Sequence, residues 1–236
     1  MNKNKAPKKI TAAQMERLFR FTREHFVEHY DLQAELADHL ANAIEERWVQ
    51  NSGLDFEEAL QAEFKKFGVF GFSDIVEKRQ NALTKKYYKL LWGYFKNFLH
   101  LPQFLGTFTA VAAVYVLLQL SPYIYILFLF SIMVVSIIKL FKLKKGYNKK
   151  VKQSGHRWLL EDIIFSCGGF GSMLYLPIQL SLHIYEEREM SALLTPVLAI
   201  LIVAIILFEY VALYILPNKA QKHLLETYPE YSIIEE

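Results

Sequence analysis

Few residues of this sequence have both the type and the spacing that chemistry requires. His25 and His29 are four residues apart. Glu35 and His39 have the same spacing, so on a helix each pair would share a face and supply two metal ligands. Two ligands do not make a metal site, and the sequence places no third beside them. We therefore expect no metal, no cofactor and no catalytic residue, and we interpret these histidines as solvent-facing or hydrogen-bonded between helices.

The acidic stretch "ELADH" is a second candidate for function. Glu35, Asp38 and His39 would project from one helix, and we predict them as a surface that docks a partner. Polar contacts within the helical bundle are the alternative interpretation.

Glu209 is the most deeply placed charge in an apolar segment. It lies eight residues before Pro217, about 12 Å inside the helix end at 1.5 Å per residue. A carboxyl group at that depth needs a partner or a proton. Lys139 is the basic side chain at comparable depth, so we predict an intramembrane polar pair between Lys139 and Glu209. A proton or ion relay through Glu209 is the functional alternative.

Small residues mark a third segment. In "SCGGFGS" Gly168 and Ser172 are four apart, and small residues at this spacing allow close packing between helices in a membrane. We predict a role in helix packing for both. Glu161 and Asp162, in the first turn of the same segment, are interpreted as helix-start residues favoured by the helix dipole.

Apolar and charged residues are segregated along the 236 residues, of which 53% are hydrophobic and 22% charged. A membrane-crossing helix needs about 20 largely apolar residues. Four segments qualify, at about 101–120, 122–141, 158–184 and 191–216, and we predict a four-helix transmembrane domain over 101–216. The N-terminus is basic and leads into an amphipathic pattern, which is not typical of a cleaved signal peptide. The single Cys167 excludes a disulfide framework.

Basic residues predict the orientation of these spans. The loop predicted between the middle pair is rich in lysine. The first connection has no basic residue, and the last has only Arg188 among three glutamates. The positive-inside rule places this loop and both termini in the cytoplasm of a multi-pass protein of the cell (inner or cytoplasmic) membrane. Contact with anionic lipid headgroups explains the lysines, and we expect no direct binding of nucleic acid.

The charged part of the chain precedes the spans. We predict a basic tail over 1–9, a cytoplasmic helical module over 10–83, an amphipathic interfacial helix over 84–100 and a cytoplasmic tail over 217–236. A dimerisation helix is the alternative for 84–100. Within the module, Thr11 with Gln14 forms a capping box before a helix from Ala12 to about His29. That helix would bury Phe26, and Asp31 would cap the next, which buries a face at spacings of three and four.

The order of these elements resembles a known domain. An acidic "ELADHL" helix, a turn with glycine, "EEAL" and "FG" before a last helix are similar to the HAAS domain and to the prefix domain of FtsX-like permeases, over about 14–80. The resemblance implies a small helical domain with a signalling or regulator-binding role, with PadR-like regulators as partners. FtsX-like permeases carry a large domain between their first two spans, whereas here only a tight turn joins them.

The sequence thus predicts an all-α protein: a small cytoplasmic helical bundle, an amphipathic interfacial helix and a four-helix transmembrane domain. We expect the module to be a regulatory or adaptor domain that signals to or docks a soluble partner. The alternative is a small transporter or transporter subunit that uses Glu209, and it would require another membrane protein or a homo-oligomer to enclose a substrate path.

Overall fold

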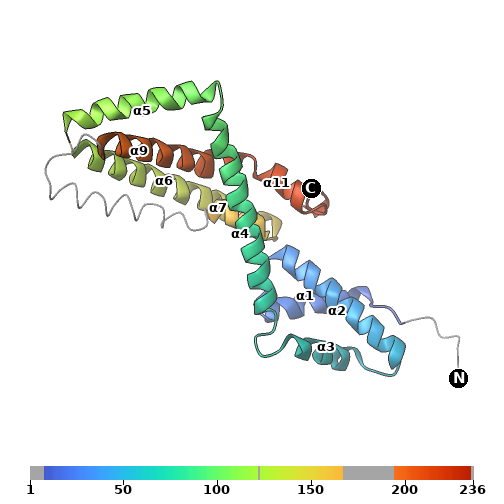
Figure 1. Ribbon diagram of the computed structural model, residues 1–236. Helices are drawn as coiled ribbons and strands as arrows, with labels where there is room; N and C mark the ends of the chain where they lie inside the picture. The colour runs from blue at the N-terminus through green and yellow to red at the C-terminus, as the bar shows by residue number, and fades with distance from the viewer. Residues whose placement is uncertain (1–7, 122, 167–193, 235–236) are drawn as a thin grey trace. The chain divides into compact units, whose positions relative to one another are not determined.

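The chain is helical in the computed structural model, which describes residues 8–121, 123–166 and 194–234 (Figure 1). These ranges contain no strand, so the predicted all-α class is confirmed for them. The chain divides into two compact units: Met1–Leu83 with Gly155–Leu159, and Thr84–Ser154 with Leu160–Glu236. It therefore passes from one unit to the other at three points.

The first unit is a small helical module. It contains α1 (Ala12–Glu24), α2 (Tyr30–Gln50), α3 (Phe56–Phe64), the 3-10 turn η1 (Lys65–Phe67) and the start of α4 (Ser73–Lys96). The predicted capping box is confirmed, because the Gln14 amide N–H donates to the Thr11 hydroxyl and the Gln14 side chain accepts from the Thr11 N–H. Asp55 caps α3 by accepting from the Glu57 N–H at 3.0 Å.

The core of this module follows the spacing of apolar residues on α2. The predicted buried positions are confirmed at Leu32, Leu36, Leu40 and Ile44. Trp48 extends this stripe by one turn, and its indole N–H donates to the Leu54 carbonyl at 3.0 Å. The polar edge of this large ring is therefore satisfied inside the core.

The first helix is shorter than the sequence predicts. α1 ends at Glu24, and Phe26, expected inside a helix reaching His29, instead has φ 63° and a 90% exposed side chain. The buried aromatic of α1 is Phe21, whose ring lies 5.1 Å from Phe64 and 6.3 Å from Phe72. These three rings fill this end of the core, and the chain turns outward before Phe26.

The second unit contains three helices long and apolar enough to cross a membrane. They cover Gln103–Leu120 (α5), Tyr123–Ser154 (α6) and Leu194–Asn218, which comprises α9 (Leu194–Tyr210), the π-helical turn η4 (Val211–Ile215) and α10 (Leu216–Asn218). α9 contacts both α5 and α6 (Figure 1). The predicted span over 158–184 lies for the most part outside the described residues, as do Gly168 and Ser172. Only its start is described, as α7 (Leu159–Ser166).

Large apolar side chains lie on both the inside and the outside of these helices. The inner set packs in one cluster, exemplified by Leu118, Tyr125 and Ile202. Phe108 and Phe130 are about 60% exposed, at 63% and 59%. Apolar surface of this extent is typical of helices that face lipid, which supports the assignment of this unit to a membrane.

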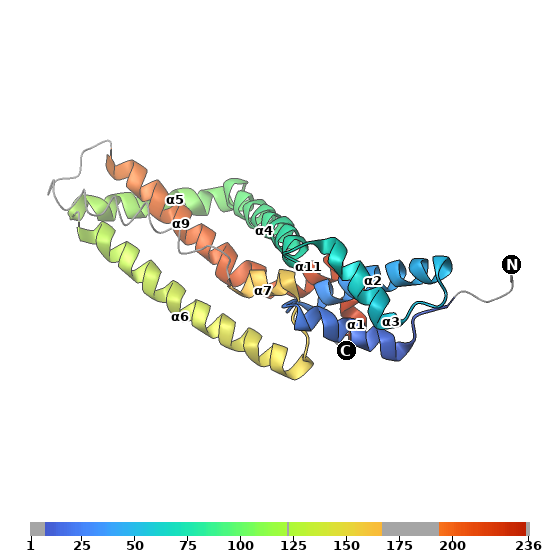
Figure 2. The same ribbon diagram turned by 90° about the horizontal axis from the view of Figure 1, so that it is seen from below.

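The lysine-rich segment predicted as a loop is helical. α6 continues without a break to Ser154 (Figure 2). Lysine is a good helix former, and Tyr147 anchors this extension because its buried ring stacks on Phe165 at 5.4 Å. The change from apolar to charged composition near Phe141 therefore marks no helix end.

The predicted C-terminal tail also folds. After α10 the chain forms α11 (Ala220–Thr227) and α12 (Tyr231–Ile234). His223 and Leu224 of α11 are buried, and the His223 Nε2 atom lies 3.0 Å from the Tyr94 hydroxyl. The segment is therefore an integral part of the second unit.

The predicted interfacial helix is the second half of α4, followed by the 3-10 turn η2 (Asn97–Leu99). One side of it packs: Tyr87 is buried, and the Phe95 ring lies 4.4 Å from Phe208. The other side is open, since Tyr88 and Trp92 are nearly half exposed. This pattern agrees with an amphipathic helix.

One ion-pair cluster in the module makes a testable prediction of pH dependence. The buried Glu63 carboxylate pairs with Arg47, and with Lys66 at 2.7 Å. Burial opposes ionisation of Glu63, but the two cations outweigh it and hold its pKa below the ordinary value of 4.5. Because the pKa is lowered in the folded state, the stabilisation is complete above about pH 4.5 and is lost as the pH falls through the folded-state pKa.

We therefore expect Glu63→Gln to make α2 and α3 less stable than in the native sequence above that pH, and the difference to shrink in acid. Hydrogen exchange of the two helices across a pH series measures this. Glu58→Gln, an exposed carboxylate of the same helix, is the matched control and should leave the profile unchanged. A difference that stays constant into acid would contradict the assignment.

Candidate functional site

The segment Gly155–Leu159, which joins α6 to α7, folds against the start of α2. The first N–H groups of a helix have no partner within the helix, and the side chain of His29, at the N-cap of α2, does not cap them. The Tyr30 N–H donates instead to the Arg157 carbonyl at 2.7 Å. In return, the Asp31 carboxylate accepts from the Leu159 N–H, the first of α7, at 3.1 Å. Each helix start is thus satisfied by the other segment.

Side chains reinforce this exchange. The Arg157 guanidinium lies 2.5 Å from the Glu28 carboxylate. The Tyr30 ring lies 4.5 Å from His156 and 5.4 Å from Trp158, and Trp158 is fully buried. Gly155–Leu159 is therefore part of the core of the module and not a linker passing beside it.

This arrangement corrects the role predicted for Asp31. The sequence predicts that Asp31 caps the helix that follows it, but Asp31 is already the second residue of α2 and caps α7 instead. Its partner, Leu159, is 128 residues away. Local spacing carries no signal of such a contact.

A pocket of about 460 Å³ lies where this segment meets α1 and α2. Its lining consists of Glu16, Phe19, Arg23, Glu28, Tyr30, Gln33, Gly155, His156 and Arg157. Two carboxylates face two guanidinium groups, and the Phe19 and Tyr30 rings stack at 5.9 Å on one wall. The formal charges of the two carboxylates and the two guanidinium groups balance.

The charged and aromatic side chains of this pocket can hydrogen-bond to a bound group or stack on it. Within the described ranges, no three His, Cys, Asp or Glu side chains are grouped so that they could hold a metal ion. His25 and His29 do not share a helix face, because α1 ends at Glu24 and His29 precedes α2. The His25 ring packs 4.2 Å from Phe64, and its Nδ1 atom lies 2.8 Å from the Phe21 carbonyl.

The three predicted docking residues lie together on the exposed side of α2. Asp38 accepts one hydrogen bond, from Asn42 of the same helix at 3.1 Å. Glu35 lies 3.8 Å from the Arg79 guanidinium, and the His39 ring meets the edge of Phe67 at 6.1 Å. Both carboxylates remain exposed to solvent.

The structure brings Lys139 and Glu209 to different partners. The Ser136 hydroxyl of α6 donates to one oxygen of the buried Glu209 carboxylate. The other oxygen has no hydrogen-bond partner among the described residues. Lys139 lies with its ammonium group 4.1 Å from the centre of the Tyr214 ring, a cation–π contact, and no ion pair joins it to Glu209 within the described part of the chain.

Sequence reasoning missed a polar network at the end of α6. The Lys150 ammonium donates to the buried Glu161 carboxylate and to the Tyr231 hydroxyl, both at 2.6 Å. It links α6, α7 and α12. The sequence indicates only a topology-determining lysine and a helix-start glutamate, because the three residues are far apart in the chain.

Comparison with known proteins adds no relative: no family model, no curated protein and no solved structure matches the chain. The resemblance of 14–80 to the HAAS domain therefore stays a prediction.

The exchange of helix starts predicts the effect of removing one cap. Asp31→Ala leaves the Leu159 N–H without its partner, at a cost of about 1 kcal/mol, as for other helix caps. Hydrogen exchange over 157–160 should then be about fivefold faster, since 1.4 kcal/mol corresponds to a factor of ten.

The matched control is Asp38→Ala, which removes an exposed carboxylate from the same helix. Equal exchange at 157–160 in both variants would show that Asp31 does not hold this segment.

Proposed function

We propose that the protein is a multi-pass protein of the cytoplasmic membrane whose N-terminal helical module is a regulatory or adaptor domain that docks a soluble partner. In this proposal both termini and the lysine-rich part of α6 lie in the cytoplasm, as the distribution of basic residues favours. The proposal includes the four spans expected from the sequence. It also includes the HAAS-like character of 14–80, with a PadR-like regulator as the class of partner.

The observation that carries the proposal is the position of Gly155–Leu159. This segment is flanked on both sides by helices of the second unit, yet its backbone completes the start of α2. A shift of α6 or α7 that moves the segment must therefore break hydrogen bonds of the module or move α2. A partner that binds one state of the module more tightly would in turn favour the matching position of α6 and α7, since coupling between sites is reciprocal.

The exposed surface of α2 carries the residues that would contact the partner. Glu35, Asp38 and His39 are exposed, and their few contacts within the module leave the carboxylates available. A partner with arginine or lysine side chains would form charge-assisted hydrogen bonds there. We assign partner docking to this surface.

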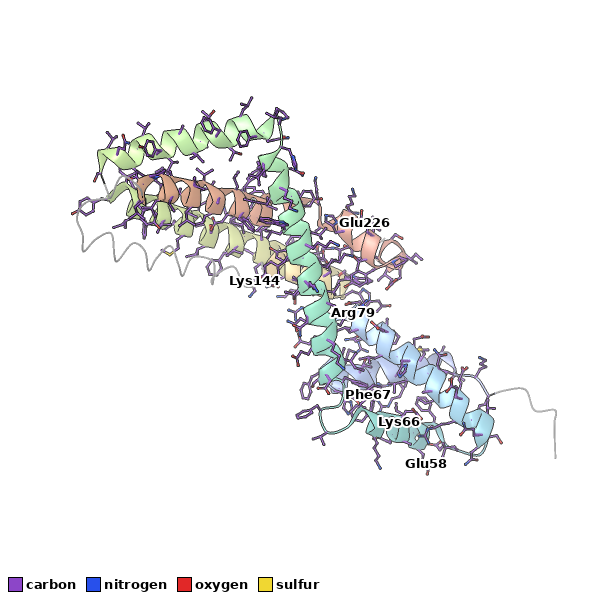
Figure 3. The ribbon with its side chains drawn as sticks, in the orientation of Figure 1. Glu58, Lys66, Phe67, Arg79, Lys144 and Glu226 are labelled. Atoms are coloured by element: carbon purple, nitrogen blue, oxygen red, sulfur yellow. The ribbon has the colours of Figure 1, made fainter. Side chains whose placement is uncertain are left out.

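The test is a crosslinked pull-down from native membranes, with the captured proteins identified by mass spectrometry. The intact chain should capture a soluble partner that is lost on deletion of 10–83. Asp38→Lys should weaken this capture by charge reversal at the docking surface, whereas Glu58→Lys, the same change at an exposed carboxylate of α3, should not (Figure 3). Capture of membrane proteins alone, retained after the deletion, would contradict the adaptor function.

A second candidate function is supported by Glu209. A buried carboxyl group with one oxygen unmatched in the described residues is costly in an apolar environment, and such groups mark proton or ion paths in transporters. Under this proposal the chain is a small transporter or a transporter subunit, and Ser136 positions the carboxyl group through its hydrogen bond.

Proton flux into vesicles reconstituted with the full chain tests this candidate. Glu209→Gln removes the titrating group and should reduce the flux to that of protein-free vesicles. Glu226→Gln changes an exposed carboxylate outside the three apolar helices and should leave the flux unchanged (Figure 3). A native chain that conducts no faster than protein-free vesicles would eliminate the candidate.

A further inference from the structure

Two turns of the module display large apolar side chains to solvent. Phe26, between α1 and α2, is 90% exposed. Val69 and Phe70, between η1 and α4, are 97% and 71% exposed. The neighbours Phe21 and Phe72 are buried, so the module has an apolar core available and leaves these three side chains outside it.

Both turns flank one aromatic cluster. Phe26 directly follows His25, whose ring lies 4.2 Å from Phe64. Val69 and Phe70 lie between Phe67 and Phe72, whose rings are 5.0 Å apart (Figure 3 labels Phe67). Phe72 in turn lies 5.0 Å from Phe64. The exposed side chains therefore belong to the same end of the module, and we refer to Phe26, Val69 and Phe70 as the apolar tip.

The backbone holds the tip in this form. Gly68 and Gly71 bracket Val69 and Phe70, and both have positive φ, 76° and 56°. A Cβ atom on Gly71 would lie 3.0 Å from the Phe64 ring, a tight contact that adds to the preference of this backbone conformation for glycine. Phe26 adopts φ 63°, which is strained for a residue with a side chain. Strain and exposure together indicate a tip that functions in contact with another surface.

The charge around the tip defines that surface. Beside Val69 and Phe70, Lys65 and Lys66 are the charged residues between Phe64 and Ser73, and Asp74 follows. The other acidic residues near the tip are paired with arginines: Glu24 with Arg17, Glu28 with Arg157 and Glu63 with Arg47. Both lysines are exposed; Lys66 contacts Glu63 at 2.7 Å, but 62% of its side chain remains accessible. Aromatic and aliphatic side chains flanked by lysines match the interface of a bilayer with anionic headgroups.

We infer that the apolar tip inserts into the headgroup region of the membrane that anchors the protein, with Lys65 and Lys66 on anionic lipid headgroups. α4 begins at Ser73, next to the tip, and its 24 residues continue into the second unit over about 36 Å at 1.5 Å per residue. The bilayer is therefore present at high effective concentration, and weak contacts suffice for docking. The proposal concerns the lipid contact of the module and stands independently of its soluble partner.

Spin-label accessibility in the full-length protein tests this contact. In a Cys167→Ser background, Phe70→Cys is labelled and the protein is placed in nanodiscs that contain phosphatidylglycerol. We expect the label to be accessible to oxygen and shielded from a water-soluble nickel complex. Val49→Cys, at a valine of α2 that is 75% exposed, is the matched control and should be open to nickel. Val69→Cys gives an independent reading should the label at position 70 disturb the tip.

Charge supplies the second arm of the test. Lys65→Gln with Lys66→Gln should lower the ratio of docked to free tip by about 30-fold, because each lysine near an anionic surface contributes about 1 kcal/mol. Nanodiscs of phosphatidylcholine alone should have a similar effect. The proposal is overturned if position 70 is as open to nickel as position 49 in anionic discs. The proposal is also overturned if shielding of the label from nickel does not depend on lipid charge and increases when each disc holds two chains. In that case a second copy of the chain, and not the bilayer, covers the tip.

Discussion

The structure of the module depends on an exchange of hydrogen bonds between two helix starts that are far apart in the sequence. The N–H of Tyr30 is satisfied by Arg157, and the N–H of Leu159 is satisfied by Asp31. A buried helix start without such partners loses stability, so each segment stabilises the other. Burial of Trp158 adds to the constraint, since loss of a buried tryptophan side chain costs about 3–5 kcal/mol. A domain of this size buries too little surface to be very stable by itself, which gives the segment a direct role in its folding.

The second unit obeys a different constraint, because polar groups on its apolar helices need partners from within the protein. Ser136 supplies one for Glu209, and the Tyr214 ring supplies one for Lys139. Glu209 and Lys139 therefore each contact a different neighbouring side chain. Near the end of α6, Lys150 satisfies its charge in a hydrogen-bond network that joins residues of three helices. These contacts fix which helix faces meet, whereas the many apolar side chains that point outward leave that choice open.

Periodic and local features were predictable from the sequence. The buried stripe of α2, from Leu32 to Ile44, follows from its spacing, and the three described spans follow from uninterrupted apolar runs. The predictions were wrong where contacts with residues distant in the sequence determine the structure. Asp31 caps α7 and not its own helix. Phe26 lies outside a core that other aromatic rings already fill. For Glu209 the sequence indicates how deep the residue lies in the membrane but not which neighbouring helix its side chain faces. Its partner, Ser136, could therefore not be predicted.

The segment after α6 is built into the N-terminal module, and this holds in the membrane-embedded protein as well. A short bifunctional thiol reagent applied to native membranes tests it, with Glu28→Cys and Arg157→Cys combined in a Cys167→Ser background. We expect rapid crosslinking within one chain, because these side chains form an ion pair at 2.5 Å. Asp38→Cys with Arg157→Cys is the control, since Asp38 is about 12 Å further along α2 from Tyr30. Equal crosslinking rates for the two pairs would show that Gly155–Leu159 is not held against the start of α2.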